Sequence, residues 1–497
     1  MSTPSNSRSG QQPDIQNRFK PENGFRILKW SFSGKDLVVV LFLAALLARL
    51  VYMVFLPVDP DDDSYHHWQI SYYTLKEGFA HGRMWDLKGM EYVWLPFPHL
   101  LGAFVLLVTG TSSLDSIRIV NLVIGAATIF PIYRLSRRLH SLQAAKYSSL
   151  LFAFFPLAVF VNICWVHETL TTFLVALAAD AFTIEDQTGR YDFVAGVFLG
   201  LASITRYEAW VIAALFLVLH AVRKRSVTML IPFVIGYSVV FLPYLWHIYN
   251  VTGDMLYGPK TQFFTFSIGE KFLTPRSRPL GIDEITIPFS ALSLLGIIVA
   301  LALISRRDSV VFAPSATYLA FAMQFSGMSP RLLLLPVTLM LVPTGRLLHG
   351  LVGRADRKKT VALVVLACLL PYSFSTQFLW GEEGLVKVFD PPADFVGSHY
   401  NGEGVVTDIP MIVHRLVNEW HIPHNSVYGF TYVPENRSEA LAWFKSKKIR
   451  WIVFTNEGYD RSQRLFPELR NGKSVGPFVF AFRADTFRSV IIVYSLA

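Results

Sequence analysis

A run of acidic residues begins where the first long apolar stretch of the chain ends. Asp63 is the last acid of this run, and His66 and His67 follow it in the stretch VDPDDDSYHHWQISYY. Ionisable side chains are costly near a membrane, so they tend to face a cavity or a partner and to mark a functional site. On a helix, two successive histidines point in different directions, so at most one should face a site with Asp63. The other acids of the run also fit a solvated loop. They are Asp59, Asp61 and Asp62.

A second acidic position lies later in the chain, in the stretch NICWVHETL. His167 and Glu168 stand there next to each other, again beside apolar runs. Two separate loops thus offer acids at a similar depth, which indicates a common site. A structural reading of Glu168 stays open, because the helix dipole stabilises an acid in the first turn of a helix.

These residues are set in a strongly apolar chain. Of its 497 residues 52% are hydrophobic and 16% charged, and the mean hydropathy is +0.40. Such values lie outside those of soluble globular proteins and predict an α-helical polytopic membrane protein. The net charge of +9 does not indicate nucleic acid, because Lys and Arg gather in short clusters between apolar runs. The two cysteines, Cys164 and Cys368, lie inside apolar runs and offer neither a disulfide framework nor a thiolate metal site.

Apolar stretches of membrane-spanning length predict about eleven transmembrane helices. The predicted spans are 37–56, 114–134, 147–164, 169–184, 193–205, 208–222, 227–247, 287–304, 310–326, 331–348 and 360–378. With this set, the basic clusters all fall on the cytoplasmic side, as the positive-inside rule requires. The apolar stretch 95–110 would reverse that arrangement as a span, so we predict an interfacial or re-entrant helix there. Residues 1–36 show no cleavable signal peptide and are predicted to be a disordered cytoplasmic tail.

The odd number of spans places the acidic stretches and the C-terminal part on the exterior face. Within a transmembrane domain of residues 37–378, the site is predicted to lie in the exterior loop 57–113, with a second long exterior loop at 250–286. Residues 386–497 predict a small exterior α/β domain. Strand-like runs such as GVVTDI, RWIVFT and SVIIVYSL alternate there with helical stretches such as RSEALAWFKSKK.

The order of several motifs resembles that of the GT-C superfamily of membrane glycosyltransferases. The stretch DSYHHWQISYYTLKEG, which begins at Asp63, is similar to the first-loop signature of these enzymes, including oligosaccharyltransferase catalytic subunits. GVFLGLASITRYEAW and SPRLLLLPVTLML resemble stretches of the protein O-mannosyltransferase and aminoarabinose transferase branch. The resemblance extends over residues 37–350 and implies a GT-C-like transmembrane domain.

The resemblance implies sugar transfer from a polyprenyl-phosphate donor, with inversion at the anomeric carbon. Asp63 would be the general base or a metal-supporting acid, because an attacking hydroxyl or amide must lose a proton. Glu168 lies where oligosaccharyltransferases have the last acid of a D-x-D or D-x-E motif, but the first position is Val166 here. A divalent metal, Mg²⁺ or Mn²⁺, on Asp63 and Glu168 therefore lacks one expected carboxylate. His167 could contribute to a softer site.

The departing polyprenyl phosphate would need cationic partners near the outer membrane surface. Arg206 and Arg331 lie on the predicted exterior side, and an arginine can donate two parallel hydrogen bonds to a phosphate. Arg206 could instead pair with its neighbour Glu208. The second long exterior loop could close over the phosphate as a lid. The remaining candidate substrate-binding residues are Lys260 and Arg276 of that loop, with His66, His67, His167 and Glu208.

Other interpretations stay open. An oligosaccharyltransferase should carry a W-W-D-Y-G motif in its exterior domain, whereas this chain has NEGYD at 456–460, which favours transfer of a single sugar. A transporter or flippase of lipid-linked sugars should show internal repeats, and the sequence shows none. An inactive scaffold would tolerate replacement of Asp63. The acceptor could be a lipid, a glycan or a protein, in the plasma membrane of a prokaryote or in the endoplasmic reticulum.

Overall fold

The computed structural model describes most of the chain. The described residues are 26–27, 30–31, 34–56, 58–77, 94–184, 188–224, 230–262, 307–322, 330–352, 387–407, 409–455, 465–485 and 490–497. The predicted spans 287–304 and 360–378 and the NEGYD stretch lie outside this part, as does the predicted loop 250–286 beyond Gln262. Within the segment predicted to be a disordered tail, β1 (Arg26–Ile27) and β2 (Trp30–Ser31) form a short antiparallel pair.

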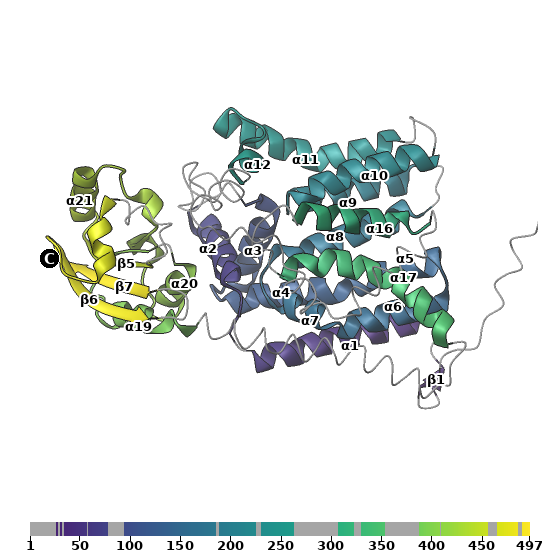
Figure 1. Ribbon diagram of the computed structural model, residues 1–497, viewed down its shortest axis with the longest axis horizontal. Helices are drawn as coiled ribbons and strands as arrows, with labels where there is room; N and C mark the ends of the chain where they lie inside the picture. The colour runs from purple at the N-terminus through teal and green to yellow at the C-terminus, as the bar shows by residue number, and fades with distance from the viewer. Residues whose placement is uncertain are drawn as a thin grey trace, which may run out of the picture.

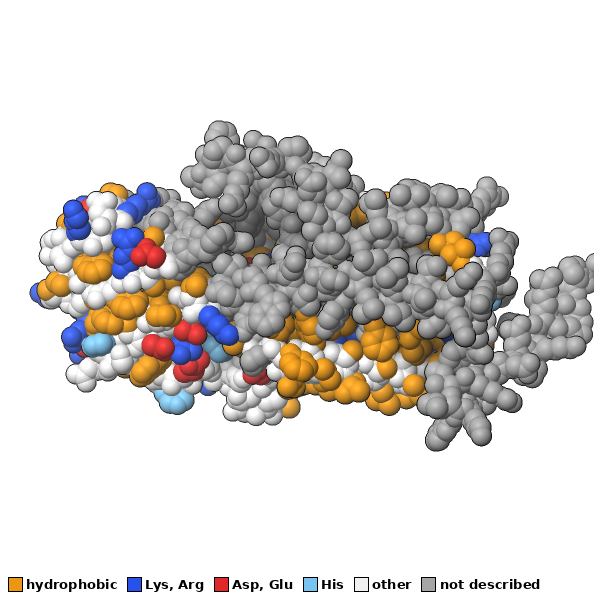
Figure 2. All heavy atoms as spheres, turned by 60° about the horizontal axis from the view of Figure 1, so that its bottom comes forward, with side chains coloured by type: hydrophobic (Ala, Val, Ile, Leu, Met, Phe, Trp, Pro, Cys, Tyr) orange, Lys and Arg blue, Asp and Glu red, His pale blue; other side chains and the backbone are white. Residues whose placement is uncertain are grey.

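The helices before residue 353 lie side by side in one bundle (Figure 1). They are α1 (Gly34–Phe55), α2 (Asp62–Glu77), α3 (Pro96–Thr109), α4 (Leu114–Ala127), α5 (Ile129–Leu139), α6 (Leu142–Phe154), α7 (Pro156–Ile163), α8 (His167–Phe182), α9 (Arg190–Ser203), α10 (Glu208–Lys224), α11 (Leu230–Thr252), α12 (Tyr257–Gln262), α16 (Ser309–Ala322) and α17 (Leu334–Val352). On α1, Leu47 and Val54 leave 61% and 77% of their surface exposed. Figure 2 shows the apolar outer side of this part of the molecule, as expected for a protein embedded in lipid.

Of the predicted spans that fall in the described part of the chain, some have the length and composition to cross a membrane and others do not. Among the described residues, four helices meet both conditions: Asp36–Phe55, Leu114–Leu139, Leu230–Thr252 and Arg331–Leu351. The predicted span 147–164 is a bent pair, α6 and α7, with an angle of 52° at the break. Pro156 begins α7, and a proline there removes a helical hydrogen bond, which explains the bend. The apolar helices α3, α10 and α16 are shorter, so the count of about eleven stays a prediction.

Glycines allow two long helices of the bundle to pack closely. A Cβ atom at Gly196 of α9 would overlap the carbonyl oxygen of Phe233 on α11, and one at Gly236 of α11 would overlap the carbonyl oxygen of Phe193. Small residues at such crossings are the usual means by which membrane helices approach each other. On its other side, α9 packs against α8, which begins at His167.

The C-terminal part of the chain forms a mixed sheet with helices around it. The sheet has the order β4-β3-β5-β7-β6, in which β3 pairs parallel with β4 and β5, and β7 pairs antiparallel with β5 and β6. Its elements are α19 (Asp390–Ser398), β3 (Gly404–Val406), α20 (Pro410–Asn418), β4 (Val427–Tyr428), α21 (Arg437–Ser446), β5 (Ile449–Thr455), β6 (Phe478–Asp485) and β7 (Val490–Leu496). The predicted strand-like runs correspond to β3, β5 and β7, and the predicted helical stretch corresponds to α21.

The C-terminal part packs directly against α2. Figure 1 shows α20 at the end of the bundle where α2 and α3 lie. His414 of α20 contacts the rings of Tyr65 and Trp68, with ring centroids 5.2 and 4.5 Å away. The Tyr73 hydroxyl donates to the His424 carbonyl oxygen at 3.2 Å. A shared apolar core therefore joins α2 to the C-terminal sheet.

Candidate functional site

The acidic run folds into the N-terminal turn of α2. The backbone amide of Asp63 donates to carboxylate oxygens of Asp61 and Asp62, at 3.0 and 2.9 Å. Acids are favoured in this turn because the helix dipole is positive there. The turn directs Asp61 and Asp63 toward the bundle, whereas Asp62 is exposed. Asp59, Asp61 and Asp62 each fitted a solvated loop in the sequence. Of these three, only Asp62 is exposed to solvent.

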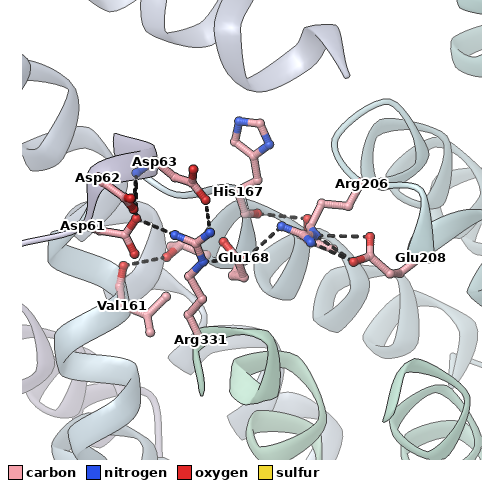
Figure 3. Close-up of polar contacts among 11 residues, drawn as sticks. Asp61, Asp62, Asp63, Val161, His167, Glu168, Arg206, Glu208 and Arg331 are labelled. Atoms are coloured by element: carbon pink, nitrogen blue, oxygen red, sulfur yellow. Dashed lines mark hydrogen bonds and ion pairs between the residues drawn. The ribbon is translucent and has the colours of Figure 1, made fainter. Parts of the chain in front are cut away.

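Arg331 forms ion pairs with acids of both predicted exterior loops. It lies in a 3₁₀ turn, Pro330–Leu333, that leads into α17. Its Nη1 and Nη2 atoms pair with the carboxylates of Asp61 and Asp63, and its Nε atom lies 3.3 Å from Glu168 Oε1 (Figure 3). The Arg331 side chain is 16% exposed and that of Glu168 only 2%. Asp63 and Glu168 therefore share one guanidinium group.

A second arginine lies on the other side of Glu168. Arg206 Nη1 donates to Glu168 Oε1 at 2.8 Å, and Nη2 donates to Glu208 Oε1 at 2.7 Å (Figure 3). The proposed pairing of Arg206 with its neighbour Glu208 is therefore present, but the same guanidinium also binds Glu168. Two guanidinium groups and four carboxylates form one network at the ends of α2, α8, α10 and α17.

The pKa values of Asp61 and Asp63, two of the acids that contact Arg331, are shifted in opposite directions. Burial would raise the pKa of Asp63, but the Arg331 charge and hydrogen bond, with smaller effects of His66 and Arg206, lower it below the usual value. Burial raises the pKa of Asp61 well above its usual value in spite of Arg331, and repulsion from Asp63 adds to this. Asp63 is thus the more acidic of the two. While Arg331 holds it, this carboxylate is a weak base.

Asp59 and Arg118 form a buried ion pair next to this network. Asp59 is 1% exposed, so the reading as a solvated loop residue is wrong for it. Its carboxylate accepts the backbone amides of Asp61 and Trp165, both at 3.1 Å, and lies 3.4 Å from Arg118 Nε. Arg118 also donates to the carbonyl oxygens of Leu56 and Ile163, at 3.1 and 3.0 Å. This pair ties the first acidic loop to the second, and sequence patterns gave no sign of it.

Histidines from three elements meet beside the acids. The rings of His67 and His167 are stacked, with centroids 3.7 Å apart, and His99 Nε2 lies 3.2 Å from His67 Nδ1. All three are at most 2% exposed. Burial, followed by the neighbouring imidazoles, lowers the pKa of His67 well below its usual value. His66, the neighbouring residue on α2, does not belong to this group of three; its ring centroid lies 6.1 Å from that of Trp94. His99 was missed; its only sequence signal is a polar residue within an apolar helix.

The predicted lid residues do not join this network in the described part of the chain. Lys260 of α12 pairs with Asp254 at 2.6 Å, and its side chain is 55% exposed. Arg276 lies outside the described residues.

Two groups of described residues could hold a metal ion. One is His67, His99 and His167, and the other is Asp61, Asp62 and Asp63; within each group the ligand atoms lie within 4.8 Å of one another. The expected pair of Asp63 and Glu168 fits a shared Mg²⁺ or Mn²⁺ ion poorly, because the Arg331 guanidinium already lies against both carboxylates.

Comparisons with known proteins agree with the resemblance. Residues 96–249 match the family model of dolichyl-phosphate-mannose-protein mannosyltransferases. The structure of ArnT from Cupriavidus metallidurans bound to undecaprenyl phosphate superposes with a TM-score of 0.60 at 12% identity, covering 92% of this chain and 97% of that one. The chain has the fold of the GT-C membrane glycosyltransferases.

A second GT-C structure is similar over less of its own length. The archaeal oligosaccharyltransferase AglB from Archaeoglobus fulgidus, in complex with an inhibitory peptide and a dolichol-phosphate, gives a TM-score of 0.55 at 14% identity, covering 92% of this chain and 75% of that one. An oligosaccharyltransferase of Archaeoglobus fulgidus in complex with Zn and sulfate gives a TM-score of 0.52 at 14% identity, covering 85% of this chain and 68% of that one. No curated protein sequence matches the chain. With its apolar helices, the GT-C fold makes this an integral membrane protein.

Proposed function

We propose that the chain transfers a single sugar from a polyprenyl-phosphate-linked donor to an acceptor on the exterior face of the membrane. The observation that carries this proposal is the Arg331 guanidinium, which joins Asp63 of the first loop to Glu168 of the second. An anion-binding group and an ionised carboxylate thus lie in contact, as transfer from a phosphate leaving group requires. The similar proteins ArnT and AglB were solved with undecaprenyl phosphate and dolichol-phosphate, which supports this donor class.

The donor phosphate is expected to displace carboxylates from the arginines. Phosphate oxygens accept the same forked hydrogen bonds as a carboxylate, so Arg331 and Arg206 would turn from Asp63 and Glu168 to the donor. Release of Asp63 from Arg331 would raise its basicity when the donor is bound. Asp63 would then be a weak base in the free protein and a stronger base in the complex with the donor.

The reaction then needs one proton transfer and one displacement. The acceptor hydroxyl or amide gives its proton to Asp63, and the acceptor atom attacks the anomeric carbon. The bond between that carbon and the phosphate oxygen breaks, and the phosphate keeps the electron pair. Guanidinium groups stabilise the charge on the departing phosphate, and nearby carboxylates stabilise the oxocarbenium-like sugar. Arg331 supplies the positive charge between Asp63 and Glu168, so no step runs through Mg²⁺ or Mn²⁺.

Coverage of the similar structures favours a single sugar over an oligosaccharide. The chain extends over 97% of ArnT but 75% of AglB, so its extent is closer to that of ArnT. We further propose that the N-terminus is cytoplasmic, and that the site and an α/β domain of residues 386–497 are exterior.

The test compares wild type with Asp63→Asn on a panel of polyprenyl-phosphate sugars and acceptors, following release of the lipid phosphate with and without chelator. Asp62→Asn is the matched control, because Asp62 is exposed and adjacent. We expect Asp63→Asn to lose on the order of a hundredfold in rate and the control to stay within about twofold of wild type. Equal turnover in wild type and Asp63→Asn would refute the catalytic assignment. Transport of the intact donor across vesicles, without release of phosphate, would favour the flippase instead.

A further inference from the structure

Three buried histidines form a compact cluster that the proposed sugar transfer does not use. His67 comes from the middle of α2, His99 from the first turn of α3, and His167 is the first residue of α8. Their exposed fractions are 2%, 0% and 2%. Polar side chains are buried at a cost unless they find partners, so three imidazoles brought together from distant parts of the chain need an explanation.

Close packing of α2 against α3 sets the spacing of two of them. A Cβ atom at Gly102 of α3 would overlap the Ser71 hydroxyl of α2. Ser71 lies one turn after His67, and Gly102 lies one turn after His99, so the same contact brings the two histidines together. The resulting distance of 3.2 Å between His67 Nδ1 and His99 Nε2 is close to the roughly 3.3 Å that separates two nitrogen ligands of a tetrahedral zinc ion.

The third histidine has a nitrogen that remains unsatisfied. His167 Nε2 is buried and has no hydrogen-bond partner within the described residues. Its ring lies against both of the others, with centroids 3.7 Å from His67 and 4.9 Å from His99. Because all three ligand nitrogens already lie within 4.8 Å of one another, side-chain shifts on the order of 1 Å would bring them to the geometry of three zinc ligands.

The surroundings of the cluster suit a bound cation of the softer kind. The Trp94 ring stands edge-on to His67 at 4.8 Å and to His167 at 5.9 Å and closes the cluster on one side. Asp63 lies one turn before His67 on α2, but the charges of Arg331 and Arg206 also act on the cluster, so the affinity for a metal comes from the imidazole nitrogens and not from a surrounding negative charge. Imidazole nitrogens select transition metals, whereas Mg²⁺ and Mn²⁺ prefer oxygen ligands.

We propose that His67, His99 and His167 form a zinc-type transition-metal site, separate from the carboxylate and arginine network. Three nitrogen ligands leave one coordination position open. The site does not depend on the proposed sugar transfer, because metal binding can be measured without donor or acceptor.

The test measures metal content of the purified full-length protein. Chelator-stripped protein is equilibrated with Zn²⁺ or Co²⁺, and bound metal is determined by mass spectrometry and by visible absorption of Co²⁺. We expect about one equivalent of Zn²⁺ per chain, undiminished by excess Mg²⁺. His99→Gln and His167→Gln should each lower the affinity by at least tenfold, whereas His66→Gln, the adjacent control, should retain it.

Two further variants keep the proposal falsifiable. His99→Cys replaces one metal ligand by another and should retain Zn²⁺, with a thiolate-to-cobalt absorption band, even if His99→Gln fails to fold. Asp63→Asn should also retain Zn²⁺. Absence of stoichiometric Zn²⁺ in wild type would overturn the proposal, as would full binding by folded His99→Gln. Loss of Zn²⁺ in Asp63→Asn with retention in His99→Gln would assign the metal to the carboxylates instead.

Discussion

Replacement of Arg331 by glutamine tests how the site is held together. The guanidinium contacts Asp61, Asp63 and Glu168 at once, and glutamine would leave these carboxylates without that charge. Removal of one partner from a buried ion pair costs about 3–5 kcal/mol in stability. The Asp63 side chain is 31% exposed and can be hydrated, so we expect a loss near the lower end, about 3 kcal/mol.

The same substitution should impair catalysis independently of stability. A lost hydrogen bond between an arginine and the donor phosphate costs about 1.5–3 kcal/mol, which corresponds to a decrease of roughly 10- to 150-fold in kcat/KM. The pH profile adds a separate signature. Arg331 lowers the pKa of Asp63, so in Arg331→Gln this pKa rises. Asp63 is then protonated at a higher pH, and the acidic limb of kcat/KM moves to higher pH.

The assay combines thermal unfolding of the purified protein with release of lipid phosphate as a function of pH. Arg346→Gln is the matched control, because Arg346 also belongs to α17, is 49% exposed and lies 3.8 Å from Asp308, in a different ion pair. Arg331→Lys keeps the charge without the fork and should fall between wild type and Arg331→Gln. If Arg331→Gln matched Arg346→Gln in stability, rate and acidic limb, the three-acid contact would have no role in the site.

Three further outcomes follow from other contacts. Asp59→Asn should lower the unfolding free energy by about 3 kcal/mol, since it removes the buried one of the two carboxylates that Arg118 contacts and leaves only the exposed Asp115; an unchanged unfolding temperature would refute the stabilising role of Asp59. Burial between Tyr65 and Trp68 lowers the pKa of His414 to about 4. This group stabilises the fold above pH 6.5, and about 3 kcal/mol is lost as the pH falls toward 4; His414→Gln should flatten that dependence in unfolding measured against pH. Gly236→Leu should overlap the α9 backbone and prevent a stable monodisperse protein in size-exclusion chromatography.

The sequence predicted the helices, the strands and the charged residues of the site better than it predicted the contacts of the buried residues. Asp63, Glu168, Arg206 and Arg331 all stood next to apolar runs, so hydropathy alone placed them at helix ends, where the bundle brings them together. The strand-like runs also became strands, because alternation of apolar residues is a local signal. Such signals depend on neighbours in the chain.

What sequence patterns missed depends on partners far away in the chain. Asp59 looked like its exposed neighbour Asp62, and only the distant Arg118 and the Trp165 amide distinguish the two. His99 looked like an isolated polar residue in an apolar helix until α2 brought His67 against it. The bend at Pro156 likewise divides one apolar run into two helices, so a count of apolar runs does not give a count of spans.

Helix α2 connects the acidic site to the C-terminal part of the chain. One side of this helix presents Asp63 and His67 to the arginines and histidines, and another side presents Tyr65 and Trp68 to His414 of the C-terminal part. A shift of the C-terminal part relative to the bundle would therefore move Asp63 relative to Arg331. In the proposed transfer, an acceptor that contacts the C-terminal part would therefore act on the pairing of Asp63 through this same helix.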